Sequence, residues 1–302
     1  METDFIDLNG QSFFLRSWGA PDKQPLLMLH GFPEYGGAWS DLAQHLANDF
    51  HCLAPDQRGY GQSWAPQGVD HYTLSKLVSD MATLAERLET PITVLGHDWG
   101  ASVAYGLAMF RPELVKRLII ANGVHPVPFQ RAMAAGGAQS AASQYINALR
   151  APDAAARFSS NNFARLEQFF RHGMGVDWLS DTLMDSYRTE WARPGRLDAM
   201  LNWYRASPLV VAKPGEPRAN LPDLPLDRLM IQCPHLLLWG PDDKALLPES
   251  TEGLESFAPN LTRMEIPDSD HWLHHQQPGK WLKLSWTGLN TPDPPFAWLI
   301  RA

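Results

Sequence analysis

Short apolar runs alternate with helical patterns through most of this chain, and this alternation restricts its fold. Four to six apolar residues without polar alternation fit a strand that is buried on both faces of a sheet. The segments between these runs carry apolar residues three and four positions apart, as amphipathic helices do. Strands that alternate with helices predict a parallel sheet covered by helices on both faces. The predicted strands are residues 26–30, 51–54, 92–95, 118–121, 235–239 and 261–266, and the predicted helices are residues 39–46, 74–88, 101–110 and 249–257.

Two regions depart from this alternation. Residues 4–8 and 12–18 flank an Asn-Gly pair, which predicts a β-hairpin with a two-residue turn. From residue 123 to residue 230 the sequence is helical and loop-rich, with no continuous strand run. We therefore predict an α/β core formed by residues 1–122 and 231–302, interrupted by a helical cap at residues 123–230. A chain of 302 residues, 44% of them hydrophobic, is long enough for both parts.

Charge and cysteine content narrow the partners and the compartment. The net charge is −8 and the 25 Lys and Arg residues are scattered, which argues against nucleic acid as a partner. The two cysteines cannot form a disulfide framework and match no metal spacing, so we expect reduced thiols and a cytoplasmic protein. We find neither a secretory signal nor an apolar run long enough to span a membrane. The sequence leaves monomer and homodimer open.

The sharpest local signal is the sequence GHDWG at residues 96–100, directly after one predicted strand and directly before a predicted helix. A strand-to-helix turn this tight forces its central residue into strained backbone geometry, which flanking glycines tolerate. The Asp98 side chain is thereby presented at the carboxyl edge of the sheet, where α/β proteins bind ligands. Backbone N–H groups at the start of the helix face the same way and can stabilise negative charge. The alternative is an ordinary turn in which Asp98 caps the helix.

Two later segments favour the catalytic interpretation. Residues 239–243, WGPDD, follow the strand at 235–239 and place an acid at another carboxyl edge. Residues 268–272, DSDHW, follow the strand at 261–266 and place His271 at the next one. The order of nucleophile, acid and histidine along the chain is that of proteins with a nucleophile elbow. A histidine alone in a loop would indicate only polar surface.

These segments resemble the epoxide hydrolases of the α/β-hydrolase superfamily, and more loosely the haloalkane dehalogenases. The similarity includes HGFPE at residues 30–34, DQRGYG at residues 56–61, the elbow, and the late acid and histidine. It implies an α/β-hydrolase fold, in which helices flank a mostly parallel eight-stranded sheet and a helical cap covers the site. It also implies an oxyanion hole built from the backbone N–H groups of Phe32 and Trp99. Asp243 falls at the acid position, and Asp242 remains an alternative.

An aspartate at the elbow determines the type of reaction. A carboxylate with an ordinary pKa of about 3.9 is ionised at neutral pH, and it attacks saturated carbon without first losing a proton. The product is an ester of Asp98. His271, oriented by Asp243, then takes a proton from the water that hydrolyses this ester. The expected substrate is a small apolar molecule in which the attacked carbon carries a strained ether oxygen or a halide, and water is the second reactant.

Tyrosines in the cap favour the epoxide. An opening epoxide needs a proton or hydrogen-bond donor for its oxygen, and phenols suit this task. The resemblance implies two such tyrosines: Tyr204, within NWYR at residues 202–205, and Tyr145, within SQYI at residues 143–146. Either could instead be a packing residue. Dehalogenases commonly hold the halide with an Asn side chain at the position of Phe32, and Phe offers no donor. The other hypotheses are an ester or lactone hydrolase and a binding protein that uses the space under the cap without turnover.

Two further features bear on cofactors and on the end of the chain. His271, His274 and His275 lie close together, but no acid with suitable spacing accompanies them, so we expect no metal and no cofactor. After Pro278 the resemblance implies a long helix. Residues 281–286 give only a turn or two of it, and the prolines at residues 291–295 break the pattern.

Overall fold

The computed structural model describes residues 1–88, 91–171, 174–221 and 224–278. Its centre is an eight-stranded sheet in the order β1-β2-β4-β3-β5-β6-β7-β8. β2 pairs antiparallel with both of its neighbours, and every other pair is parallel. The strands are β1 (Glu2–Leu8), β2 (Gln11–Trp18), β3 (Gln24–Leu29), β4 (Phe50–Pro55), β5 (Ile92–His97), β6 (Val115–Ala121), β7 (His235–Trp239) and β8 (Leu261–Glu265). The mostly parallel sheet and the N-terminal hairpin predicted from the sequence are confirmed.

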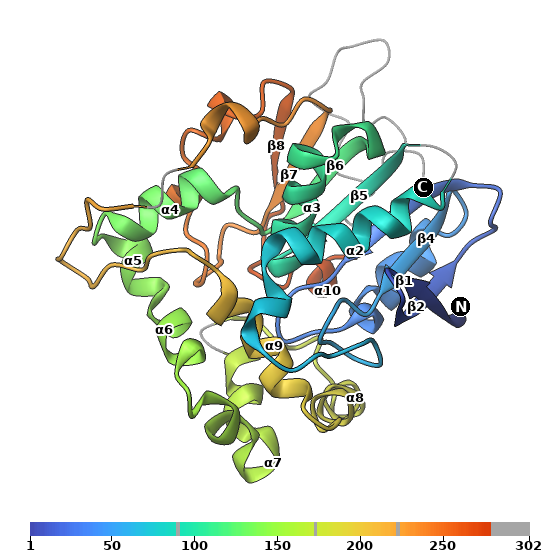
Figure 1. Cartoon of the computed structure of the whole chain (residues 1–302), viewed down its shortest axis with the longest axis horizontal. Coiled ribbons are helices and arrows are strands. Elements are labelled where there is room, and N and C mark those ends of the chain that lie inside the picture. Colours follow the sequence, from blue (N-terminus) through green and yellow to red (C-terminus); the bar gives the residue numbers. More distant parts are fainter. Residues whose placement is uncertain (89–90, 172–173, 222–223, 279–302) are drawn as a thin grey trace.

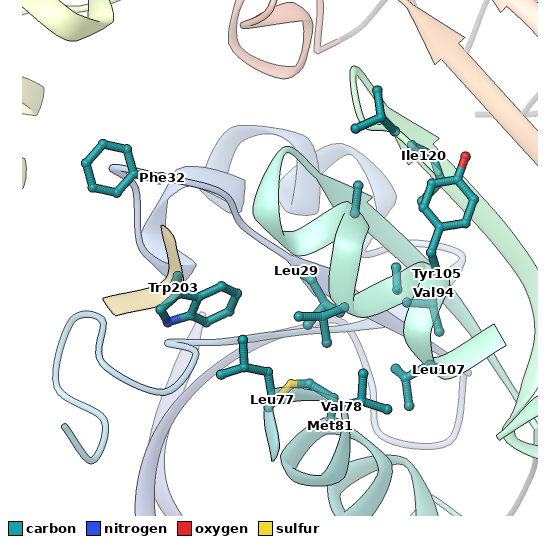
Figure 2. Packing of buried hydrophobic residues seen from close by; sticks show 14 of the residues in the cluster. Leu29, Phe32, Leu77, Val78, Met81, Val94, Tyr105, Leu107, Ile120 and Trp203 are labelled. Atoms are coloured by element: carbon teal, nitrogen blue, oxygen red, sulfur yellow. The ribbon is translucent and has the colours of Figure 1, made fainter. Parts of the chain in front are cut away.

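Alternate residues of the central strands serve two separate hydrophobic layers. Leu27 and Leu29 of β3 pack on one face of the sheet, and Leu26 and Met28 pack on the other. Helices α2 (Leu74–Glu86) and α3 (Trp99–Phe110) cover the first face, where their apolar side chains meet those of β3 and β5 (Figures 1 and 2). Helix α1 (Ser40–Leu46) and the short α10 (Leu273–Gln276) contribute to the second layer. The sheet is therefore buried on both faces, as its continuous apolar strands require.

In the described part of the stretch between β6 and β7 lie six α-helices, although these two strands are neighbours in the sheet. Figure 1 shows α6 to α9 grouped together on one side of the sheet. Two indole N–H groups fasten this group to loops of the core: Trp191 donates to the carbonyl of Pro33 at 2.7 Å, and Trp203 to that of Arg58 at 2.9 Å. The domain boundaries at residues 122 and 231 remain a prediction. The six helices are α4 (Pro126–Ala134), α5 (Ala138–Ala142), α6 (Gln144–Arg150), α7 (Ala154–Phe170), α8 (Asp181–Trp191) and α9 (Arg196–Ala206).

One predicted element is wrong, and another lies outside the described residues. Instead of a helix over residues 249–257, the chain forms two short 3₁₀ turns, Pro248–Thr251 and Leu254–Ser256. Gly253 separates them with φ of +78°, a left-handed conformation that ends a right-handed helix. The expected short helix at residues 281–286 is outside the described part of the chain. None of the helices in the described ranges has the length and apolarity that a membrane crossing requires.

Candidate active site

The elbow after β5 has the strained geometry that its glycines predict. β5 ends at His97, α3 begins at Trp99, and Asp98 between them has φ of +48° and ψ of −118°. A side chain at Gly96 would meet the Cα of Ala101, and one at Gly100 would meet the carbonyl of Leu29. Only glycine lets the turn approach the core so closely. Asp98 is thus held in a conformation that non-glycine residues rarely adopt, typical of functional sites.

The loop after β3 brings a donor to this aspartate. The backbone N–H of Phe32 donates to Oδ1 of Asp98 at 2.8 Å. His30 fixes the same loop, because its Nε2 accepts from the N–H of Gln57 at 3.1 Å and its carbonyl accepts from the Gln57 side chain at 2.6 Å. Trp99, the second expected oxyanion donor, is the first residue of α3. Of the two expected N–H donors, that of Phe32 contacts the Asp98 carboxylate, and that of Trp99 directly follows Asp98 in the chain.

His271 lies between two carboxylates at the carboxyl edge of the sheet. Its Nδ1 is 2.8 Å from Oδ2 of Asp243, and its Nε2 is 3.8 Å from Oδ2 of Asp98. All three side chains are largely buried, although 14% of the Asp98 side chain is accessible. Asp242, the alternative acid, is exposed, and its backbone N–H donates to the carbonyl of Ser269. The geometry thus places Asp243 against the histidine.

The two carboxylates raise the proton affinity of this histidine. Burial by itself would lower the pKa of His271, but Asp243 and then Asp98 raise it to about 9. Burial would raise the pKa of the Asp243 carboxyl, yet the charge of His271 and the hydrogen bonds of the site hold it below its ordinary value. At neutral pH the site therefore contains an imidazolium between two carboxylates.

Asn122 is a residue of this site that the sequence reasoning did not find. Its side-chain N–H donates to Oδ2 of Asp243 at 2.7 Å, and its Oδ1 accepts from the N–H of Gly240 at 2.7 Å. Backbone N–H groups of Ala245 and Leu246 donate to the other oxygen of Asp243. Asn122 directly follows β6. The rule that located the acid and the histidine, a polar residue at the carboxyl edge of a strand, also applies to it.

The two cap tyrosines approach Asp98 from α6 and α9. The rings of Tyr145 and Tyr204 lie 6.4 Å apart between centroids, and the Tyr204 ring contacts Phe32 at 5.2 Å and Trp99 at 5.1 Å. Burial raises the pKa of both phenols, and the charge of Asp98 raises it further. Both hydroxyls therefore stay protonated near neutral pH and are competent as donors.

Glu34 forms a buried cluster with two histidines. Its Oε2 is 3.1 Å from Nε2 of His274, and its Oε1 is 2.6 Å from Nε2 of His275 and 2.8 Å from the hydroxyl of Tyr187. The expectation that no acid accompanies these histidines was wrong, because the fold joins residues about 240 positions apart. Zinc accepts such a ligand set. However, zinc on Nε2 of His274 would leave a proton on Nδ1, which has no partner among the described residues.

His97 connects this cluster to the loop that carries the catalytic candidate His271. Its Nε2 is 2.8 Å from the carbonyl of His271, and its Nδ1 is 3.5 Å from Oε2 of Glu34. Both side chains are fully buried. Burial would raise the pKa of the Glu34 carboxyl, but His274 and His275 hold it well below its ordinary value. An ionised carboxylate therefore sits behind the loop of His271.

Comparison with known proteins places this arrangement in a family. The model of the alpha/beta hydrolase fold matches residues 24–278. Human epoxide hydrolase 4 is 31% identical over 93% of this chain and 76% of its own length. A solved epoxide hydrolase from metagenomes of hot environments is 36% identical, with a TM-score of 0.81 over 90% of this chain and 93% of that one. The Bacillus megaterium epoxide hydrolase is 29% identical, with a TM-score of 0.82 over 92% and 96% of the two chains.

The comparisons and the fold agree over most of the chain. They confirm the predicted resemblance and the predicted fold class, and they make the protein an enzyme of the hydrolase class. The chain belongs to the epoxide hydrolases of the α/β-hydrolase superfamily.

Proposed function

We propose that this enzyme opens epoxides to vicinal diols through an ester formed on Asp98. The observation that carries the proposal is the position of the Asp98 carboxylate, between the N–H of Phe32 at 2.8 Å and Nε2 of His271 at 3.8 Å. This position suits two successive roles of the Asp98 carboxyl group. The carboxylate attacks carbon first, and its own carbonyl is attacked afterwards.

In the first step, an oxygen of Asp98 bonds to an epoxide carbon and the carbon–oxygen bond of the strained ring breaks. Tyr145 and Tyr204 donate hydrogen bonds to the departing oxygen, which their protonated phenols suit. The proton that finally neutralises this oxygen comes from the imidazolium of His271. Esterification removes the negative charge of Asp98, which lowers the pKa of His271 and leaves the imidazole neutral.

In the second step, the neutral His271 takes a proton from water as the water attacks the ester carbonyl. Asp243 stabilises the imidazolium that forms, at 2.8 Å from its Nδ1. The N–H groups of Phe32 and Trp99 stabilise the oxyanion, and each such donor contributes about 3 kcal/mol to the transition state. Collapse of this intermediate breaks the bond to the diol oxygen, which takes the proton of the added hydroxyl. The diol leaves, and the Asp98 carboxylate and the protonated histidine are restored.

An epoxide fits this site better than a haloalkane does. A departing halide needs N–H donors, and the side chain of Phe32 supplies none, whereas the two phenols near Asp98 match an oxygen leaving group. Aromatic side chains surround the nucleophile, which favours a small apolar substrate, with water as the only other reactant. A cytoplasmic location and a monomeric or homodimeric state remain predictions.

The test is mass spectrometry of intact His271→Gln after exposure to epoxides and haloalkanes. We expect an adduct to accumulate on Asp98, because the carboxylate and the two phenols still open the ring, although more slowly without the imidazolium of His271, while hydrolysis stalls. An epoxide adds its whole mass, whereas a haloalkane adds its mass minus the hydrogen halide. The double variant Asp98→Ala, His271→Gln is the control and should stay unmodified. Absence of an adduct from every epoxide overturns the mechanism, and an adduct from haloalkanes alone makes the enzyme a dehalogenase.

A further inference from the structure

Four aromatic rings form a closed circuit beside the nucleophile. Going round it, Phe32 contacts Tyr204 with centroids 5.2 Å apart, and Tyr204 contacts Tyr145 at 6.4 Å. Tyr145 then contacts Phe169 at 5.3 Å, and Phe169 returns to Phe32 at 5.6 Å. Each contact is edge-on, the favourable geometry for aromatic pairs. The four residues come from the loop after β3, α9, α6 and α7, so the circuit joins core and cap.

Phe169 is the member of this circuit without a part in the proposed chemistry. Phe32 offers its backbone N–H to Asp98, and the tyrosines offer their hydroxyls, whereas Phe169 contributes only its ring. Phe32 and Tyr204 are buried, but Phe169 is only half-buried, as is Tyr145. Asp98 also keeps an accessible fraction. Asp98, Tyr145 and Phe169 thus each keep some accessible surface, and the rings of Tyr145 and Phe169 contact each other.

The neighbouring Phe170, not Phe169, packs the end of α7 into the core. Phe170 is fully buried and lies against Tyr187 at 4.9 Å, Trp191 at 5.8 Å and Trp272 at 4.9 Å. That side chain anchors the end of α7 in the hydrophobic core. Phe169, one position earlier on the helix, points to a different side and contacts the rings of the site. Because Phe170 already holds α7 in place, this role does not explain why Phe169 is half-buried and contacts the rings of the site.

We propose that Phe169 sets the size limit for the substituent of the epoxide, and that the enzyme prefers terminal epoxides with a short alkyl group or a single aromatic ring. The inference rests on the proposed function. With the epoxide oxygen held by Tyr145 and Tyr204 and a carbon at Asp98, the substituent extends among the rings of the circuit. Phe169 closes the circuit between Tyr145 and Phe32, so a long chain has to displace its ring. A short or flat group fits against the apolar ring faces without displacing them.

The test compares Phe169→Ala with wild type and with Phe163→Ala. Phe163 lies in the same segment, at the end of a non-helical stretch (residues 160–163) that interrupts α7, and it is also half-buried and packs against Trp191 at 5.8 Å, away from the circuit. Its variant therefore controls for the loss of a half-buried ring from this segment. The substrates are 1,2-epoxybutane, styrene oxide and 1,2-epoxydecane. The ratio of kcat/KM for epoxydecane to that for epoxybutane should rise about tenfold or more in Phe169→Ala, mainly through a lower KM for the long substrate. Phe163→Ala should keep the wild-type ratio.

Each outcome decides a different point. An unchanged ratio in Phe169→Ala, or the same change in Phe163→Ala, overturns the size limit while epoxide turnover by the wild type upholds the proposed function. A uniform fall of kcat for all three substrates, with a lower Tm, shows that Phe169 only supports the fold. If the wild type turns over no epoxide and His271→Gln gains no adduct, the proposed function fails and the inference falls with it.

Discussion

The two sides of the active site are held by different forces. At the sheet edge, Asp243 is held by hydrogen bonds from Asn122, Ala245 and Leu246 and by His271. On the cap side, ring contacts between centroids 5.1–6.4 Å apart surround the tyrosines, and among the described residues few side-chain hydrogen bonds reach them: one from Arg150 to the carbonyl of Tyr204 and one between the side chains of Tyr204 and Trp99. Hydrogen bonds are directional and costly to leave unmade when buried, whereas aromatic contacts tolerate small shifts. The histidine and its acid are therefore held firmly at the edge, whereas the rings at the cap can adjust to the substrate.

The largest effect should come from breaking the sheet edge at Asp243. Asp243→Asn keeps the shape but removes the charge that orients and stabilises the His271 imidazolium, so kcat should fall about 10³- to 10⁴-fold. The control is Asp242→Asn, since Asp242 is exposed and should leave kcat unchanged. Steady-state assays of diol formation measure both variants. Equal losses in the two variants would contradict the assignment of the acid.

A smaller loss should follow when the cap side loses its donors but keeps its rings. Tyr204→Phe and Tyr145→Phe each remove one hydroxyl, and each should lower kcat/KM for epoxides about 10²-fold. In the His271→Gln background, the same changes should slow formation of the Asp98 adduct in rapid-quench experiments. Ester turnover that survives both changes, with no effect on epoxides, would instead favour an ester or lactone hydrolase.

Removal of Asn122 should weaken the edge without breaking it. Asn122→Ala takes away one of the donors to Asp243, while the N–H groups of Ala245 and Leu246 and the contact with His271 remain. One such hydrogen bond is worth about 1–1.5 kcal/mol, so kcat should fall about tenfold. A loss as large as that of Asp243→Asn would show that Asn122 does more than hold the acid.

The smallest change to the sheet-edge site is deprotonation of His271 as the pH is raised. The pKa of His271 is raised to about 9, so the imidazolium is present below that pH and is lost above it. Because kcat/KM reports the free enzyme, it should fall to about half near pH 9 and about tenfold per further unit. The raised pKa also stabilises the fold below about pH 6.5, and this contribution disappears as the pH rises through about 9. Stability measured by urea unfolding should therefore decline over this interval in wild type and less in His271→Gln.

The sequence predicted the sheet edge better than the cap because parallel strands constrain where their ends lie. Strand ends indicated Asp98, His271 and an acid at residue 242 or 243, and the resemblance favoured Asp243. The same rule applies to Asn122, which directly follows β6. The contacts of Glu34 with His274 and His275 depend on how the loop after β3 packs against α10. The spacing of these residues in the sequence does not predict such contacts.

The cap is less predictable because side-chain packing, not strand register, positions its residues. A local motif indicated Tyr204, whereas nothing in the sequence indicated that Phe169 would close a circuit of rings. The local sequence pattern also gave a wrong prediction at residues 249–257, where it indicated one helix. The left-handed conformation of Gly253 divides it into two turns.

The cap is inserted between two strands that remain directly paired. Its ends leave from β6 and return at β7, and the N–H of Asn122 still bonds to the carbonyl of Leu238 at 3.0 Å. The two ends of the inserted segment therefore lie side by side, because β6 and β7 are paired in the sheet. Transplanting such a segment from a relative would exchange the substrate range together with the two tyrosine donors, while Asp98, Asp243 and His271 stay on the original sheet.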